Sequence, residues 1–278
     1  MDAPLNQVII PENFQELFSA WSRFPEAVCY AGGTILNGRQ ENNIISLPPA
    51  FICLDKIDEL KNITRTEHYL EIGSMARLNR LINLGKAVPE VLSGCIKKIG
   101  GVQLRNIATI GGNICGANVY STDIPAPLIA LDAQYELKNA GSSRWVSASR
   151  FHSPSEDTTM EKQELLTRIR LPLHQWDYAV YKKFQIEGYL NNAAVVFLAR
   201  THKNILSEIR VVYKTRSIVR NKICEDILNG KLLPLSRKTA DDFIENWKDF
   251  LNSKQEEREI TKNTLINCIQ ENVYNLSA

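Results

Sequence analysis

The chain has 278 residues, of which 44% are hydrophobic and 23% charged, with 33 Lys and Arg against 31 Asp and Glu. This length allows two domains with a large core, and the composition is that of a globular protein, not a disordered or fibrous one. A net charge of +2 gives no electrostatic case for nucleic acid, and no apolar run of about 18 residues predicts a membrane span. The first residues resemble no signal peptide, so we expect a cytoplasmic protein.

The six cysteines are widely dispersed along the chain. They are Cys29, Cys53, Cys95, Cys115, Cys224 and Cys268. Zinc and iron–sulfur sites normally draw their ligands from close local pairs, because a short turn can aim two thiolates at one metal. We therefore predict that most of these cysteines are buried structural thiols, and that the chain carries no metal centre of its own.

Strands and helices alternate in the first half of the chain. The apolar patterns predict strands at residues 8–10, 27–30, 51–55 and 69–73, and helices at residues 14–24, 35–38, 74–85 and 89–100. Ser74 is a candidate cap of the third helix. Residues 103–114 are predicted to be extended and broken at Gly111-Gly112, after which Pro125 opens an apolar helix. Strands are expected at residues 135–138 and 165–171.

The C-terminal part has a different pattern. Three alternating segments, at residues 178–185, 193–199 and 205–213, predict an antiparallel sheet. Helices are expected at residues 219–228, after a capping pair formed by Thr239 and Asp242, and at residues 264–274. We place a domain boundary near residues 173–177, which gives one domain at residues 1–174 and a second at residues 175–278.

Two glycine turns are the candidate ligand-binding features. They are Ala31-Gly32-Gly33-Thr34 and Thr109-Ile110-Gly111-Gly112-Asn113. Neither matches the G-x-G-x-x-G fingerprint or the P-loop. A Gly-Gly pair nevertheless lets the backbone approach a ligand closely and point successive N–H groups at phosphate oxygens. The alternative is that both are ordinary turns that need glycine for a positive φ.

The residues around the second turn resemble a known family. Leu104-Arg105-Asn106-Ile107-Ala108-Thr109-Ile110-Gly111-Gly112-Asn113 is followed by Asp123-Ile124-Pro125-Ala126-Pro127-Leu128 and then by Ala130-Leu131-Asp132-Ala133. This closely resembles the FAD-binding subunit of the molybdenum hydroxylases, the medium-subunit family of xanthine dehydrogenase and carbon monoxide dehydrogenase. The first turn, with Leu36 two positions after Thr34, also resembles that family's A-G-G-T loop.

The resemblance implies an α+β fold. A two-part FAD-binding domain of the vanillyl-alcohol-oxidase (PCMH) type would precede a smaller α+β domain with an antiparallel sheet. Both glycine loops would hold the FAD diphosphate through backbone N–H groups. The implied cofactor-binding residues are Ala31, Gly32, Gly33, Thr34, Ile35, Leu36, Thr109, Ile110, Gly111, Gly112, Asn113, Asp123, Leu166 and Lys183.

Three of these residues have roles implied by the resemblance. Asp123 would accept a hydrogen bond from ribityl or ribose hydroxyls; it could also serve as an N-cap before Pro125, and the two roles are compatible. Leu166 would pack on the cofactor. A lysine of the second domain would reach the flavin region, and the family's Y-x-K spacing favours Lys183 over Lys182, although either could be a solvated strand lysine.

The resemblance also implies partners. Electrons would come from iron–sulfur centres on another subunit, beside a molybdopterin subunit, and reduced flavin would pass them to NAD⁺ or another acceptor. A purine is the substrate that the family suggests for the assembled enzyme. Two alternatives remain: a self-sufficient flavin oxidase, and a degenerate scaffold without cofactor. The four histidines are expected to be surface or hydrogen-bonded residues, not ligands.

Overall fold

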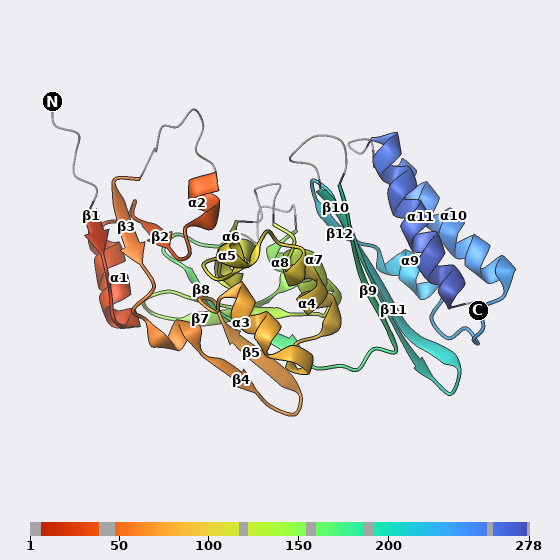
Figure 1. The fold of residues 1–278 in the computed structure, drawn as a ribbon, viewed down its shortest axis with the longest axis horizontal. Helices are drawn as coiled ribbons and strands as arrows, with labels where there is room; N and C mark the ends of the chain where they lie inside the picture. Colours follow the sequence, from red (N-terminus) through yellow and green to blue (C-terminus); the bar gives the residue numbers. More distant parts are fainter. Residues whose placement is uncertain are drawn as a thin grey trace.

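The fold comes from a computed structural model, which describes residues 7–38, 48–116, 122–153, 160–185, 192–254 and 258–276. Three β-sheets follow one another along the longest axis, with helices between and around them (Figure 1). None of the helices in these ranges is long and apolar enough to cross a membrane. The mixture of helices and largely antiparallel sheets confirms the predicted α+β class.

The first sheet is small and parallel. Its strands, in the order β1-β3-β2, are β1 (Gln7–Ile9), β2 (Val28–Tyr30) and β3 (Ala50–Cys53). Helix α1 (Phe14–Arg23) begins at Asn13, whose side chain accepts a hydrogen bond from the Glu16 N–H at 2.9 Å. Leu17 of α1 and Ile52 of β3 are fully buried in a shared core. Helix α2 (Thr34–Gly38) begins in the first glycine turn.

The second sheet is antiparallel, in the order β4-β5-β8-β6-β7. Its strands are β4 (Ile63–Arg65), β5 (Tyr69–Gly73), β6 (Gln134–Lys138), β7 (Ser143–Ser147) and β8 (Leu165–Pro172). Short helices accompany it: η1 (Asp58–Lys61), α3 (Leu78–Asn83), η2 (Gly85–Ala87), α4 (Glu90–Lys97), α5 (Val102–Arg105), α6 (Ile110–Cys115), α7 (Pro125–Ala130) and α8 (Ala148–Phe151). Leucine, isoleucine and valine side chains from the sheet and from these helices form the largest core.

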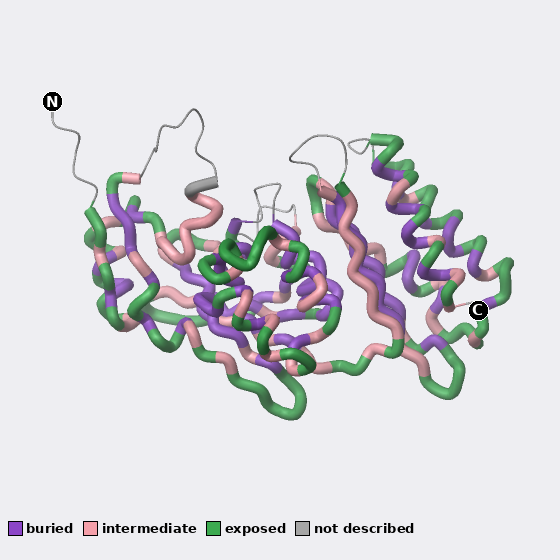
Figure 2. The backbone as a smooth tube through the Cα atoms, in the orientation of Figure 1, coloured by how far each residue is buried: buried purple, intermediate pink, exposed green. Residues whose placement is uncertain are grey.

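The third sheet is antiparallel, in the order β12-β11-β10-β9. Its strands are β9 (Tyr178–Gln185), β10 (Asn192–His202), β11 (Ile205–Lys214) and β12 (Ile218–Arg220), and its helices are α9 (Lys222–Asp226), α10 (Arg237–Asn252) and α11 (Glu259–Asn275). Along β10, Val195 and Phe197 pack toward α10 and α11, whereas Val196 and Leu198 join the core formed with α4 and α7. Because both faces are covered, most of β10 is buried (Figure 2).

Four local predictions were wrong. Residues 103–114 were expected to be extended, but they contain most of helices α5 and α6. Helix α6 begins after Thr109, which caps it by accepting the Gly112 N–H at 3.1 Å. Ser74 does not cap α3, which begins after Arg77. The segment expected to be helical from residue 219 starts as strand β12, paired with β11. Helix α10 is capped by Ser236, two turns ahead of the Phe243 that buries its apolar face.

All six cysteines are free thiols. Three of them are buried, two are half-buried and Cys115 is exposed, so the prediction of mostly buried thiols holds for half of them. Within the ranges that the structure describes, no group of three or more His, Cys, Asp or Glu side chains is placed to hold a metal ion.

Candidate functional site

The two glycine turns meet in space. A Cβ atom on Gly32 would lie 2.2 Å from the Ile107 carbonyl oxygen, just ahead of the second turn. A Cβ on Gly116, at the end of α6, would lie 2.4 Å from Cδ1 of Ile35 in the first turn. At Gly32 the contact is with backbone, so glycine is required there by the close approach of the two segments, whereas at Gly116 the contact is with the end of the Ile35 side chain.

The first turn presents backbone donors. Gly33 has a φ of +66°, a left-handed conformation that glycine adopts easily. In the described part of the chain, no acceptor takes the backbone N–H of Gly32, Gly33 or Thr34. These residues are half-buried, so three consecutive N–H groups are available at a concave point of the chain.

Most backbone N–H groups of the second turn already donate hydrogen bonds within the protein. The N–H of Ile110 donates to the Ala76 carbonyl at 3.0 Å, and that of Gly111 donates to the Ser74 carbonyl at 2.8 Å. The Gly112 N–H donates to the Thr109 hydroxyl. A Cβ on Gly111 would lie 2.7 Å from Ser74 Cβ, so this glycine allows α6 to pack on the chain after β5. The second turn therefore supplies shape and close packing. Among its described N–H groups only that of Thr109 has no acceptor, against three consecutive N–H groups in the first turn.

Asp123 lies between two lysines from the third sheet. Its carboxylate is buried, with 1% of the side chain exposed, and Lys183 Nζ lies 2.6 Å from Oδ2. Lys214 Nζ lies 2.9 Å from Oδ1. Asp123 is not the cap of α7, whose first flanking residue is Ile124 and which has no side-chain cap. The two lysines together give this buried cluster a formal charge of +1.

The structure separates the two candidate lysines. Lys182 and Lys183 are neighbours on β9 and therefore point to opposite faces of the sheet. Lys182 pairs with Glu271 on α11, at 2.5 Å, whereas Lys183 reaches Asp123. Sequence reasoning missed Lys214, because only the pairing of β11 with β10 brings it near a residue 91 positions away.

Further groups surround this cluster. Asn113 accepts a hydrogen bond from the Ile124 N–H at 3.3 Å, which ties α6 to the residue after Asp123. Burial raises the pKa of Cys95 to about 12, so its thiol is protonated at neutral pH. The Tyr181 ring lies 5.5 Å from Lys98 Nζ, and burial raises the pKa of the tyrosine.

The remaining residues predicted to bind the cofactor lie in the core or around the first turn. Leu166 is buried in the main core opposite Leu137. Ile110 is also fully buried, as an anchor of α6. Ala31, Thr34 and Leu36 are half-buried around the first turn.

The geometry fits a dinucleotide such as FAD. A diphosphate requires close backbone approach and free N–H donors, and the first turn offers both. The Asp123 cluster is linked to the second turn through the hydrogen bond from the Ile124 N–H to Asn113, and its net positive charge suits a ligand that carries negative charge. Asp123 retains acceptor capacity beyond its two lysines, because a carboxylate has about four lone-pair sites.

Comparison with known proteins identifies the family. The family model for the FAD binding domain in molybdopterin dehydrogenase matches residues 4–174. The chain belongs to this family. The glyceraldehyde dehydrogenase medium chain of Sulfolobus acidocaldarius is 29% identical over 186 residues, which cover 66% of either chain. The carbon monoxide dehydrogenase medium chain of Hydrogenophaga pseudoflava is 31% identical over 170 residues, covering 59% of this chain and 58% of that one.

A solved structure shares the whole fold. A chain in the structure of reconstituted CO dehydrogenase from Oligotropha carboxidovorans has a TM-score of 0.81 at 21% identity, covering 100% of this chain and 99% of that chain. The aligned segments span about two thirds or less of the curated relatives' own length. In aldehyde oxidase 2 of Cavia porcellus, the match covers 14% of the protein.

Proposed function

We propose that this chain is the FAD-binding electron-transfer subunit of a molybdenum-dependent, xanthine dehydrogenase-like hydroxylase. The observation that carries the proposal is the close meeting of the two glycine turns, with three N–H groups in the first that no described residue accepts. The family match at residues 4–174 supports it. It also supports a division into a FAD-binding domain at residues 1–174 and a C-terminal domain at residues 175–278.

In this proposal, the chain's residues hold and orient the cofactor. The N–H groups of Gly32, Gly33 and Thr34 bind the diphosphate, and the second turn shapes the wall opposite. Asp123 accepts a hydrogen bond from a sugar or ribityl hydroxyl, and Lys183 extends toward the flavin. Leu166 keeps the predicted role of an apolar support. FAD supplies the redox chemistry when bound, since it can exchange electrons singly or in pairs.

The rest of the enzyme would lie on other chains. The medium-chain names of two relatives support an assembly with further subunits, for which we propose an iron–sulfur subunit and a molybdopterin subunit. NAD⁺ is the proposed acceptor and a purine the proposed substrate class of the assembled enzyme. A cytoplasmic location completes the proposal.

The test compares two glycine-to-alanine variants. Gly32→Ala places a methyl group against the Ile107 carbonyl, whereas Gly94→Ala, in the middle of α4, meets nothing within 4 Å. After incubation with FAD and gel filtration, we expect the flavin absorbance band at about 450 nm in the wild-type protein and in Gly94→Ala, and at least a tenfold lower flavin content in Gly32→Ala. Far-UV circular dichroism confirms that each variant is folded.

Two results would oppose this proposal. Equal flavin content in Gly32→Ala and the wild type would show that the first turn does not hold the cofactor. Bleaching of the flavin by an organic substrate, without any other subunit, would instead support a self-sufficient oxidase.

A further inference from the structure

Residues of strand β11 contact both ends of helix α7. Arg210, Val212 and Lys214 alternate along the strand and point to the same face. Lys214 pairs with Asp123 just before α7, and Val212 enters the core. Arg210 donates to the Ala130 carbonyl at the far end of the helix, at 2.7 Å.

The strand spans the helix. The four steps of strand from Arg210 to Lys214 span about 13 Å. Helix α7, from Pro125 to Ala130, rises about 7.5 Å over five steps, and Asp123 lies two residues before its start. One strand of the third sheet can therefore fix α7, and with it Asp123, at two points.

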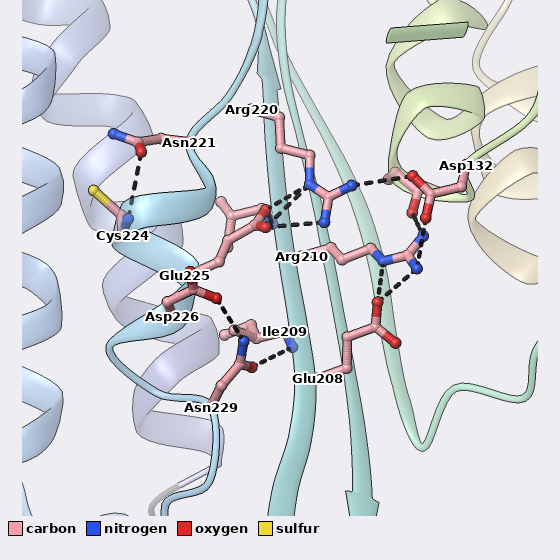
Figure 3. Close-up of polar contacts among 12 residues, drawn as sticks. Asp132, Glu208, Ile209, Arg210, Arg220, Asn221, Cys224, Glu225, Asp226 and Asn229 are labelled. Carbon is pink, nitrogen blue, oxygen red and sulfur yellow. Dashed lines mark hydrogen bonds and ion pairs between the residues drawn. The ribbon is translucent and has the colours of Figure 1, made fainter. Parts of the chain in front are cut away.

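A network of ion pairs surrounds the C-terminal end of helix α7. Arg210 also pairs with Asp132 at 2.7 Å and with Glu208 at 2.5 Å. Arg220 on β12 joins Asp132 to Glu225, as Figure 3 shows. Asp132 itself has a φ of +53°, so the chain after α7 is held in a conformation that non-glycine residues adopt only infrequently.

The lysines at the near end differ in their exposure. Lys214 has 5% of its side chain exposed, whereas Lys183, on an edge strand, has 20% exposed. Each lysine pairs with a different oxygen of Asp123. If Lys183 left to contact a ligand, Lys214 would still compensate the buried carboxylate, which would be costly to leave without a cation.

We propose that Lys214 is a positioning residue for the cofactor site: it holds the Asp123 carboxylate in place, so that Lys183 can exchange from Asp123 to the bound FAD. This inference rests on the proposed FAD function. It separates two lysines that make similar ion pairs. Lys214 acts through Asp123, and Lys183 acts on the ligand.

The experiment measures FAD dissociation constants by quenching of flavin fluorescence, together with the visible circular dichroism of the bound flavin. Groups that orient a ligand-binding side chain commonly contribute about ten- to a hundredfold, as the supporting residues of metal sites do. We expect Lys214→Met to weaken FAD binding by about that factor and to change the visible dichroism. Lys214→Arg should restore both. Lys182→Met is the matched control, because its ammonium group pairs with Glu271 on the opposite face.

A double-mutant cycle tests the route through Asp123. If Lys214 acts by holding Asp123, Lys214→Met should weaken FAD binding no further in an Asp123→Asn background. Lys214→Gln takes the place of Lys214→Met if the latter does not fold. Wild-type affinity in Lys214→Met or its substitute Lys214→Gln, or additive effects in the cycle, would overturn the inference while leaving the proposed function intact. Failure of the wild-type chain to bind FAD would overturn both.

Discussion

At the scale of single residues, His152 predicts how stability depends on pH. Burial lowers the pKa of His152 to about 4 from a usual 6.5. Its Nε2 lies 3.3 Å from the Tyr135 hydroxyl, and its ring packs edge-on against Phe151. The ring is therefore neutral in the folded protein at pH 5, whereas in the unfolded chain most of it is protonated.

The direction in which stability changes with pH follows from proton binding. Between pH 6.5 and 4 the unfolded state binds a proton that the folded state does not, so the free energy of unfolding falls as the pH falls. The loss is at most about 3 kcal/mol below pH 4. Urea unfolding at pH 7 and pH 5 measures the part of this loss that occurs above pH 5. His152→Gln should reduce the difference in the free energy of unfolding between the two pH values. His202→Gln, at the exposed end of β10, should leave the difference unchanged; if His152→Gln also left it unchanged, another group would be responsible.

At the scale of elements, the β11 contact with α7 predicts a stability effect. Arg210→Met removes hydrogen bonds to the Ala130 carbonyl and ion pairs to Asp132 and Glu208. Only 6% of the Arg210 side chain is exposed, and hydrogen bonds to charged groups contribute about 1.5–3 kcal/mol. We expect the free energy of unfolding in urea to fall by about 2–3 kcal/mol.

An exposed ion pair provides the control. Lys248 pairs with Glu245 within α10, and both side chains are largely exposed. Lys248→Met should change the free energy of unfolding by less than about 0.5 kcal/mol. An equally small effect of Arg210→Met would show that β11 does not hold α7.

Elements long enough to show a regular pattern of apolar residues were predictable from the sequence. Strands β8 to β11 and helix α4 came close to their predicted ranges, because each has enough residues to show a period of 2 or 3.6. Helices α5 and α6 have four and six residues, which is too short for such a period. Gly111-Gly112 looked like a break, but in the fold Gly111 lets α6 pack on Ser74.

At the scale of the whole molecule, local motifs identified the glycine turns and Asp123 but not how they are held. Lys214 and Arg210 act on segments about 80 to 90 positions away, and nothing in the local sequence marks them. Their placement depends on the register of β11 against β10. Among the described residues, most N–H groups of the second turn already donate within the protein, whereas those of Gly32, Gly33 and Thr34 do not, a difference that the local sequence does not show.

Titration of the purified 278-residue chain with FAD tests whether the two glycine turns form a FAD site. We expect saturable binding of one FAD per chain, followed by quenching of flavin fluorescence, with a higher unfolding midpoint in excess FAD because the ligand stabilises the folded state. Gly32→Ala should bind FAD more weakly, and Gly94→Ala should bind it as the wild type does. If the folded wild-type chain neither bound FAD nor gained thermal stability from it, the two turns would not be a FAD site.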